Sequence, residues 1–372
     1  MKTLAISPRA AAGGAETLLL QTVKGLARPF DPWHVVFFEA GPVEAELRGC
    51  AGVTTEVLDA GRLRDIGRFL RTVRQLRHRL LAGGFKRAVA WMPKAHLYLA
   101  PAAWGIDIDV RWWQHGIPRP PSWIDRLATW LPASAILCPS RVAAEAQERL
   151  GGAPVRVVPP GLSGPHADSE AARKLRRELL SDGQVLALTV SRIQPSKGLH
   201  VLVECAQLLA SQLPGLVWAI AGGARPEDES YHRSLVSAVL APGSPRVIWL
   251  GERQDVPELL SAADLLVHPS LGESFGLAVL EAMAAGLAVV STDCGGTRDL
   301  VIDGVTGRLV PVNDAPGLAK AIAEVVADPN LRHRMGQAGR TLQQQRFGPE
   351  AFLNAAVRAL MDDPTSVQTR DP

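Results

Sequence analysis

The sequence predicts an α/β protein of two domains, each doubly wound around a mostly parallel sheet. Short apolar segments of strand length alternate with helical patterns along the chain, and the alternation restarts after the Pro-Pro-Gly sequence at 159–161. Many apolar segments end in glycines or polar residues, the position where open α/β sheets bind ligands. A chain of 372 residues is long enough to form two hydrophobic cores.

The composition is that of a globular protein. Hydrophobic residues make up 47% of the chain and charged residues 21%, and the net charge of +3 is too small to indicate nucleic-acid binding. No apolar run approaches the roughly 18 residues that span a bilayer. Residues 1–7 are too short in their apolar part for a signal peptide, so we expect a strand there. The four cysteines lack metal or redox spacing, which predicts reduced thiols in a cytoplasmic protein.

The first half of the chain has two candidate ligand positions. Its expected strands are 2–7, 35–39, 88–91, 110–114, 135–140 and 155–158, with a helix at 141–150. Gly13 and Gly14 follow the first strand and would let a ligand approach the backbone, although a plain tight turn explains Gly13 equally well. His115 follows the strand 110–114 at its carboxyl end, so we expect it at a cleft edge. Of the tryptophans near it in sequence, we expect most in the core and one or two against an acceptor: Trp112, Trp113, Trp123 and Trp130.

Residues 62–87 are strongly basic. They contain nine arginines and lysines against one acid, Asp65. One helical face in this segment is apolar, formed by Ile66, Phe69, Leu70, Val73, Leu76 and Leu80. The first interpretation is a packed helix with a solvated basic face. The second adds a docking surface for anionic lipid headgroups.

The second half repeats the alternation. We expect strands at 185–190, 217–221, 247–250, 265–268 and 288–291, a hairpin-like piece at 306–311, and helices at 258–263, up to 345 and at 349–361. Arg192 and Lys197 lie in one strand-to-helix loop. This pair of cations suits a diphosphate, which Arg binds by bidentate hydrogen bonds and Lys as a point charge.

The segment 272–300 carries the strongest signal. Ser274 is expected to cap a helix that Gly286 ends, so the backbone N–H groups of Phe275, Gly276 and Leu277 would form an anion site in its first turn. Glu273 and Glu281 would be about 12 Å apart along such a helix at ~1.5 Å per residue. That is too far for a retaining hydrolase, whose carboxyls lie roughly 5 Å apart. Two separated carboxylates beside an anion site suit hydroxyl groups at two places on a nucleotide sugar.

These residues resemble a known family. Glu273-Ser-Phe-Gly-x4-Glu281-Ala-Met-Ala-x-Gly286, followed by Gly295-Gly296-x-x-Asp299, is similar to the E-x7-E signature of the retaining GT-B glycosyltransferases of family four, the glycosyl transferases of group 1. Asp299 stands where Glu is usual. The Arg-x4-Lys-Gly motif at 192–198 fits the family, and so does Gly-Gly-x-Glu at 13–16. Pro160 replaces the usual Asn of Pro-Asn-Gly. The resemblance is strongest from Ser191 to Asp299.

The resemblance implies a GT-B fold, with two Rossmann-like domains facing one another across a cleft. Residues 1–162 would bind the acceptor and 163–348 the nucleotide sugar, 349–362 would pack back on the first domain, and 363–372 would be a disordered tail. Glu281 would hold the ribose, Glu273 the sugar hydroxyls, and His115 would lie near the reacting carbon, with Gly13 and Gly14 facing the donor phosphates. Arg192, Lys197 and the amides after Ser274 would stabilise the departing diphosphate.

The implied activity is transfer of a hexose to an acceptor hydroxyl with retention of configuration and without a metal or other cofactor. Asp107-Ile-Asp109 resembles the metal motif of the GT-A fold, but it precedes its strand and alternates with apolar residues, so we interpret it as structural. A glycan, a lipid-linked acceptor or a small natural product all remain open as acceptors. We expect a cytoplasmic enzyme of cell-envelope polysaccharide or glycolipid synthesis, peripheral on the inner membrane face if residues 62–87 touch lipid. The rival hypotheses are a non-hydrolysing nucleotide-sugar epimerase and a non-catalytic sugar-nucleotide-binding partner.

Overall fold

The computed structural model describes residues 1–361 except 12, 165–167 and 242, and its chain divides into two compact units. The N-terminal unit comprises Met1–Pro160 with Phe352–Pro372, and the C-terminal unit comprises Gly161–Ala351. The predicted tail 363–372 lies outside the described residues. No helix in the described part of the chain is both long and apolar enough to cross a bilayer.

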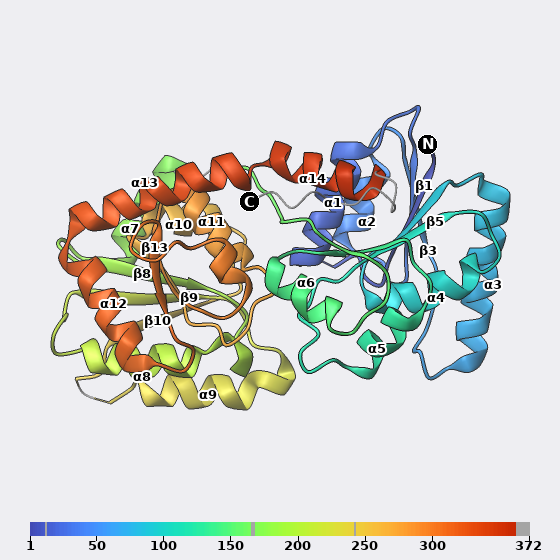
Figure 1. Cartoon of the computed structure of the whole chain (residues 1–372). Helices are drawn as coiled ribbons and strands as arrows, with labels where there is room; N and C mark the ends of the chain where they lie inside the picture. Colours follow the sequence, from blue (N-terminus) through green and yellow to red (C-terminus); the bar gives the residue numbers. More distant parts are fainter. Residues whose placement is uncertain (12, 165–167, 242, 362–372) are drawn as a thin grey trace. The chain divides into compact units, whose positions relative to one another are not determined.

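The N-terminal unit is built on a seven-stranded sheet in which every pair of neighbours is parallel (Figure 1). Its strands are β1 (Thr3–Ser7), β2 (Trp33–Phe37), β3 (Val53–Val57), β4 (Arg87–Ala90), β5 (Asp109–Trp113), β6 (Ala135–Cys138) and β7 (Val155–Val157). The spatial order is β3-β2-β1-β4-β5-β6-β7, so the direction of winding reverses between β1 and β4. Sequence analysis missed β3, whose Val-Thr-Thr-Glu-Val sequence is half polar because β3 is an edge strand.

Helices cover both faces of this sheet. They are α1 (Gly14–Leu26), α2 (Pro42–Arg48), α3 (Ile66–Gly83), α4 (Pro93–Ala103), α5 (Trp123–Trp130), α6 (Arg141–Glu148) and α14 (Pro349–Met361). Alternate strand residues face opposite sides, so Ala5 packs with α1, α2 and α14, whereas Leu4 and Ile6 pack with α3, α4, α5 and α6. Buried Arg111 also donates a hydrogen bond to the carbonyl of Ala359 in α14.

The C-terminal unit has a six-stranded parallel sheet in the order β10-β9-β8-β11-β12-β13. The strands are β8 (Val185–Val190), β9 (Leu216–Ala221), β10 (Arg246–Gly251), β11 (Leu265–His268), β12 (Ala288–Thr292) and β13 (Gly307–Val310). The helices are α7 (Ser169–Leu179), α8 (Leu199–Leu209), α9 (Glu229–Ala238), α10 (Val256–Ala262), α11 (Leu277–Ala285), α12 (Ala315–Ala327) and α13 (Pro329–Arg346), with short 3-10 turns η1 (Pro195–Lys197), η2 (Pro226–Asp228) and η3 (Gly296–Asp299).

The hairpin-like piece predicted at 306–311 is wrong. Residues Gly307–Val310 form β13, which pairs in parallel with β12. A side chain at Gly307 would overlap the carbonyl oxygen of Val289, so only glycine lets this edge strand approach β12.

Candidate functional site

Both units place loops at the carboxyl ends of neighbouring strands where the strand order reverses. In the C-terminal unit the reversal lies between β8 and β11, and in the N-terminal unit between β1 and β4. Open α/β sheets bind ligands at such points, because the loops from the two strands diverge there and leave a crevice. The predicted site residues lie in or next to loops that leave the carboxyl ends of β1, β5, β8 and β11, except Glu281, which lies within helix α11.

Three loops of the C-terminal unit are tied together at this edge. Leu271 N donates to Ser196 O at 2.9 Å, which joins the loop after β11 to the loop after β8. Glu273 N donates to Cys294 O at 2.9 Å, which joins the loop after β11 to the loop after β12. Gly198, at φ +65°, has no room for a side chain because a Cβ there would overlap the carbonyl oxygen of Pro269. This close approach presents Lys197 to the loop that follows β11.

Glu273 is the centre of the resulting cluster. Its Oε1 atom forms an ion pair with Lys197 Nζ, accepts a hydrogen bond from Ser270 Oγ at 3.0 Å and lies 3.3 Å from His268 Nε2. Burial acts to raise the pKa of Glu273, but the interactions with His268 and Lys197 outweigh it and lower that pKa to about 2. The carboxylate is therefore ionised throughout the neutral range. Among the described residues, all of these contacts are to Oε1, and Oε2 is left for another hydrogen-bond donor.

His268 is a site residue that sequence analysis missed. It ends β11 and is buried, and the pattern Leu-Leu-Val-His was interpreted only as a core strand. The available signal was its position, because a side chain at the last residue of a strand at the switch point faces the ligand edge.

Arg192 and Glu281 lie outside the cluster around Glu273. Arg192 is exposed in the loop after β8, without a contact to the Glu273 cluster in the described chain. Glu281 lies on α11, and burial raises the pKa of its carboxyl to about 7. No described residue forms an ion pair or hydrogen bond with that carboxylate. Glu281 is thus a desolvated carboxyl without a protein partner.

The predicted helix start at Ser274 is wrong. Helix α11 begins at Leu277, and its N-cap is Gly276 in a left-handed conformation at φ +104°. The residues before Gly276 stay outside the helix because Glu273 forms a parallel bridge with Gly295, and Gly296 lies so close to Phe275 that a Cβ would overlap its backbone. The first-turn amides are therefore those of residues 277–279. In the described chain, the backbone N–H groups of residues 274–279 have no hydrogen-bond acceptor, so the anion-binding character remains but is displaced along the chain.

The N-terminal unit brings the Gly13–Gly14 loop and His115 together through Trp91. Trp91 Nε1 donates to Ala15 O at 2.7 Å, and the Trp91 ring lies 5.3 Å from the His115 ring. His115 also stacks on Trp113, with an angle of 8° between the planes. Burial lowers the pKa of His115 to about 3, so its imidazole is neutral at pH 7. Its buried Nε2 has no hydrogen-bond partner among the described residues.

The tryptophans near His115 in sequence separate in the structure. Trp112 and Trp113 are fully buried, whereas Trp123 and Trp130 are exposed on α5. Asp109 is bound by two arginines, with Arg87 Nε at 3.1 Å and Arg111 Nε at 2.9 Å from Oδ2. No group of three or more His, Cys, Asp or Glu side chains in the described residues is arranged to hold a metal ion.

Two parallel α/β units of this topology, each with its loops at a switch point, have the fold of the GT-B glycosyltransferases. The crystal structure of Anabaena HepE in complex with UDP and glucose superposes with a TM-score of 0.83 and 25% sequence identity, over 97% of this chain and 99% of that one. The family described as Glycosyl transferases group 1 matches residues 171–342, and Glycosyltransferase Family 4 matches residues 12–163. The chain belongs to the group 1 glycosyltransferases of family four.

Relatives of known name are glycosyltransferases of several pathways. The lipopolysaccharide core biosynthesis glycosyltransferase LpsE of Rhizobium meliloti strain 1021 is 29% identical over 64% of this chain and 76% of its own length. The alpha-maltose-1-phosphate synthase of Mycobacterium tuberculosis strain H37Rv is 39% identical over 44% of each chain. The second match thus spans less than half of that relative.

Proposed function

We propose that this glycosyltransferase moves a hexose from a nucleoside-diphosphate sugar to an acceptor hydroxyl, with retention of configuration and without a metal. The observation that carries the proposal is the state of Glu273. One of its carboxylate oxygens is held by Lys197, Ser270 and His268, while the other is left to accept from a ligand. A carboxylate that is fixed and ionised can accept hydrogen bonds from sugar hydroxyls without reorganising.

The phosphate groups of the donor would lie beside this carboxylate. Lys197 shares its ammonium group with Glu273, and an ammonium has three donors, so it can also bind a phosphate oxygen. The amides that open α11 and the exposed guanidinium of Arg192 add further positive potential. Charge that develops on the leaving diphosphate would be stabilised by these groups rather than by a metal ion. The complex of HepE with UDP and glucose supports a donor of this kind.

Glu281 and His115 complete the proposed donor contacts. The unpartnered carboxylate of Glu281 suits the two adjacent hydroxyls of a ribose. The neutral imidazole of His115 can donate to or accept from a sugar hydroxyl through Nε2, depending on its tautomer. Its stacking on Trp113 fixes the plane of the ring.

The acceptor class that we propose is a cell-envelope glycan or glycolipid, on the cytoplasmic side of the membrane. LpsE, which is named for lipopolysaccharide core biosynthesis, supports this class. Contact between residues 62–87 and an anionic membrane surface belongs to the same proposal. The alternative is a natural-product acceptor, which the one or two tryptophans expected against an acceptor would suit; of the four, Trp113 lies against His115.

The test is donor binding followed by product analysis. Thermal unfolding is measured with UDP-, GDP-, ADP- and TDP-glucose, with and without EDTA, because a ligand that binds only the native state raises the midpoint. We expect one nucleotide to shift the midpoint equally with and without EDTA, and expect Glu273→Gln and Lys197→Met to remove most of the shift. The matched control is Glu204→Gln, an exposed glutamate on α8. NMR of the glycosylated product then determines the anomer. A shift that requires divalent metal, or an inverted product, would refute the corresponding part of the proposal.

A further inference from the structure

Three helices of the N-terminal unit lie side by side over one face of its sheet. Helices α3 and α5 each pack against α4, and all three bury residues in the core formed with β1 and β4. Figure 1 shows α3, α4 and α5 next to one another in the N-terminal unit, and we consider their outward sides together as one outer surface. The three exposed tryptophans of the described residues belong to it: Trp104, just after α4, is 69% exposed, and Trp123 and Trp130 of α5 are 61% and 81% exposed.

The contribution of α3 is an apolar strip on the side that faces α4. Ile66, Leu70 and Leu81 are exposed although Leu76 and Leu80 of the same helix are buried. Helical spacing places Ile66, Leu70, Arg77 and Leu81 in one line along α3. Arg77 fixes the direction of this line, because its Nη1 atom donates to Ala102 O at 3.2 Å and to Trp104 O at 2.6 Å. The exposed apolar residues of α3 therefore lie on the side of the helix that faces the end of α4.

The contribution of α5 is a second strip. Trp123, Leu127 and Trp130 follow one another at spacings of four and three residues, so they lie on one face of the helix, and all three are exposed. Ser122 and Asp125 form a capping box at the start of this eight-residue helix, which fixes the strip in place.

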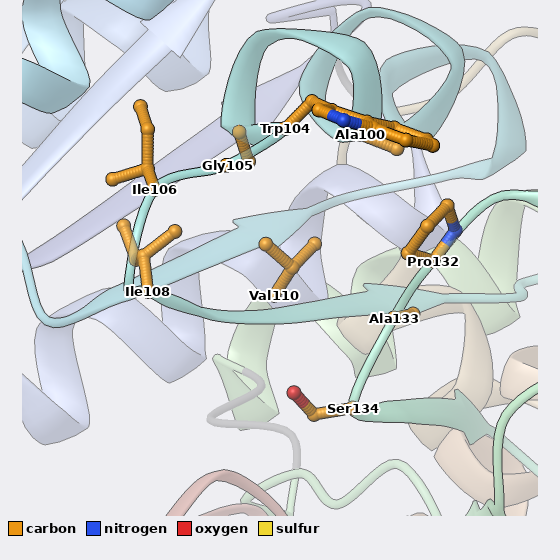
Figure 2. A pocket seen from close by; sticks show the side chains of 10 residues that line it. Ala100, Trp104, Gly105, Ile106, Ile108, Val110, Pro132, Ala133 and Ser134 are labelled. Atoms are coloured by element: carbon orange, nitrogen blue, oxygen red, sulfur yellow. The ribbon is translucent and has the colours of Figure 1, made fainter.

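A pocket of about 380 Å³ lies between the end of α4, the start of β5 and the loop that leads from α5 to β6. Trp104 and Pro132 form one side of it, and Pro132 follows Trp130 by two residues. Figure 2 shows Val110 pointing toward the Trp104 indole, with Ile108 beside Ile106. Apart from Trp104 and Ser134, the lining side chains carry no polar atom. The pocket opens at the amino ends of β5 and β6, the opposite edge from His115, so it is not part of the proposed donor site.

The segment 62–87 adds positive charge to this surface, even when the arginines that form ion pairs within the protein are left out. Within 62–87, Arg68, Arg79 and Arg87 are paired with Asp59, Glu56 and Asp109, and Arg77 binds the carbonyls described above. Besides Arg77, four arginines have no ion-pair partner among the described residues: Arg62, Arg64, Arg71 and Arg74. Arg74 lies one helical turn from Leu70, so cation and apolar residue share the same stretch of α3.

We propose that this surface docks on an anionic phospholipid bilayer, with Trp104, Trp123 and Trp130 inserted at the level of the headgroups and an acyl chain in the pocket. Tryptophan is enriched at membrane interfaces because its ring is apolar and its N–H is polar, and arginines beside an apolar face are attracted to anionic headgroups. The proposed function includes only electrostatic attraction between residues 62–87 and the membrane, and this proposal adds insertion of side chains. It rests on the proposed glycolipid acceptor only for the reason why the enzyme would bind a membrane.

The experiment measures binding of the full chain to sedimented vesicles of phosphatidylcholine, with and without phosphatidylglycerol. We expect binding to the mixed vesicles only. Trp104→Ser combined with Trp130→Ser should weaken it at least tenfold, and Arg71→Gln combined with Arg74→Gln should weaken it by about fivefold per arginine. The matched controls are substitutions of exposed residues elsewhere. Phe30→Ser combined with Leu240→Ser is the control for the tryptophan variant, and Arg334→Gln is the control for the arginine variant; both should bind vesicles as the wild type does. Brominated lipid should quench the tryptophan fluorescence of the wild type and not that of Trp104→Phe combined with Trp123→Phe and Trp130→Phe.

Two results would overturn the proposal. One is binding that the tryptophan variants leave unchanged, which would reduce the contact to electrostatics. The other is dimerisation of the free protein that these variants abolish, which would make the surface an interface with a second copy. The thermal shift caused by the nucleotide sugar that binds the wild type is measured on the same variants. Because it reports the donor site alone, loss of vesicle binding with a normal shift separates this proposal from the proposed function.

Discussion

Glu281→Gln should stabilise the protein at pH 8 and weaken donor binding at the same time. Burial raises the pKa of Glu281 from 4.5 to about 7, so the folded protein binds this proton more tightly than the unfolded chain does. The resulting stability is fully present below pH 4.5 and is lost as the pH rises through 7. At about 1.4 kcal/mol per pKa unit the loss is roughly 3 kcal/mol, and partial exposure of the side chain reduces this to about 1–3 kcal/mol.

Urea unfolding at pH 4.5 and pH 8 measures this effect. The Gln variant should match the wild type near pH 4.5 and exceed it at pH 8, whereas Glu204→Gln, on the exposed side of α8, should show no such dependence. Donor affinity should fall by about ten- to a hundredfold in Glu281→Gln, because a hydrogen bond to a charged group contributes roughly 1.5–3 kcal/mol. Equal stability differences at the two pH values would show that the carboxyl is not desolvated. Unchanged donor affinity would remove Glu281 from the proposed ribose site.

Three further predictions concern the framework of the site. His268→Gln should raise the pKa of Glu273 from about 2, which NMR titration of the carboxyl would show and which a purely structural role for His268 would not produce. Gly198→Ala should destabilise the C-terminal unit by at least about 2 kcal/mol in urea, since its Cβ meets Pro269 O, whereas Gly272→Ala, with open space around it, should not. Arg111→Met should cost about 2–4 kcal/mol, because it removes the contacts to Asp109 and Ala359 O, and exposed Arg126→Met should be neutral in the same assay.

Hydrophobic patterning predicted most of the architecture because parallel strands are buried on both faces. The segments 185–190 and 265–268 coincide with β8 and β11, and the final helix coincides with α14. Edge strands have no such signal: β3 was missed, and β13 was interpreted as part of a hairpin. Both lie at the rim of a sheet, where polar residues and glycine are tolerated and apolar alternation is lost.

The site was predictable as a set of loops but not in its contacts. The Ser-Phe-Gly sequence fits a helix N-cap at Ser274, but a left-handed Gly276 and the bridge from Glu273 to Gly295 delay the helix to Leu277. The bridge joins residues 22 positions apart, so local sequence does not encode it. Long-range contacts also explain why the basic segment 62–87 is less basic than its sequence indicates. Arg79 and Arg87 look like surface charges in the sequence, but they form ion pairs with Glu56 and Asp109 on other elements.

The contacts of Glu273 in the absence of ligand suggest how the donor would bind. Lys197 is the only one of its three partners that carries a fixed positive charge, and it is the one that an incoming phosphate would attract. We infer that Lys197 turns part of its ammonium group toward the diphosphate, while Ser270 and His268 keep Oε1 in place. Without these two groups, binding of the phosphate would release the carboxylate that has to accept the sugar hydroxyls. Ser270 and His268 therefore let Lys197 bind the phosphate while the carboxylate that accepts the sugar hydroxyls stays preorganised.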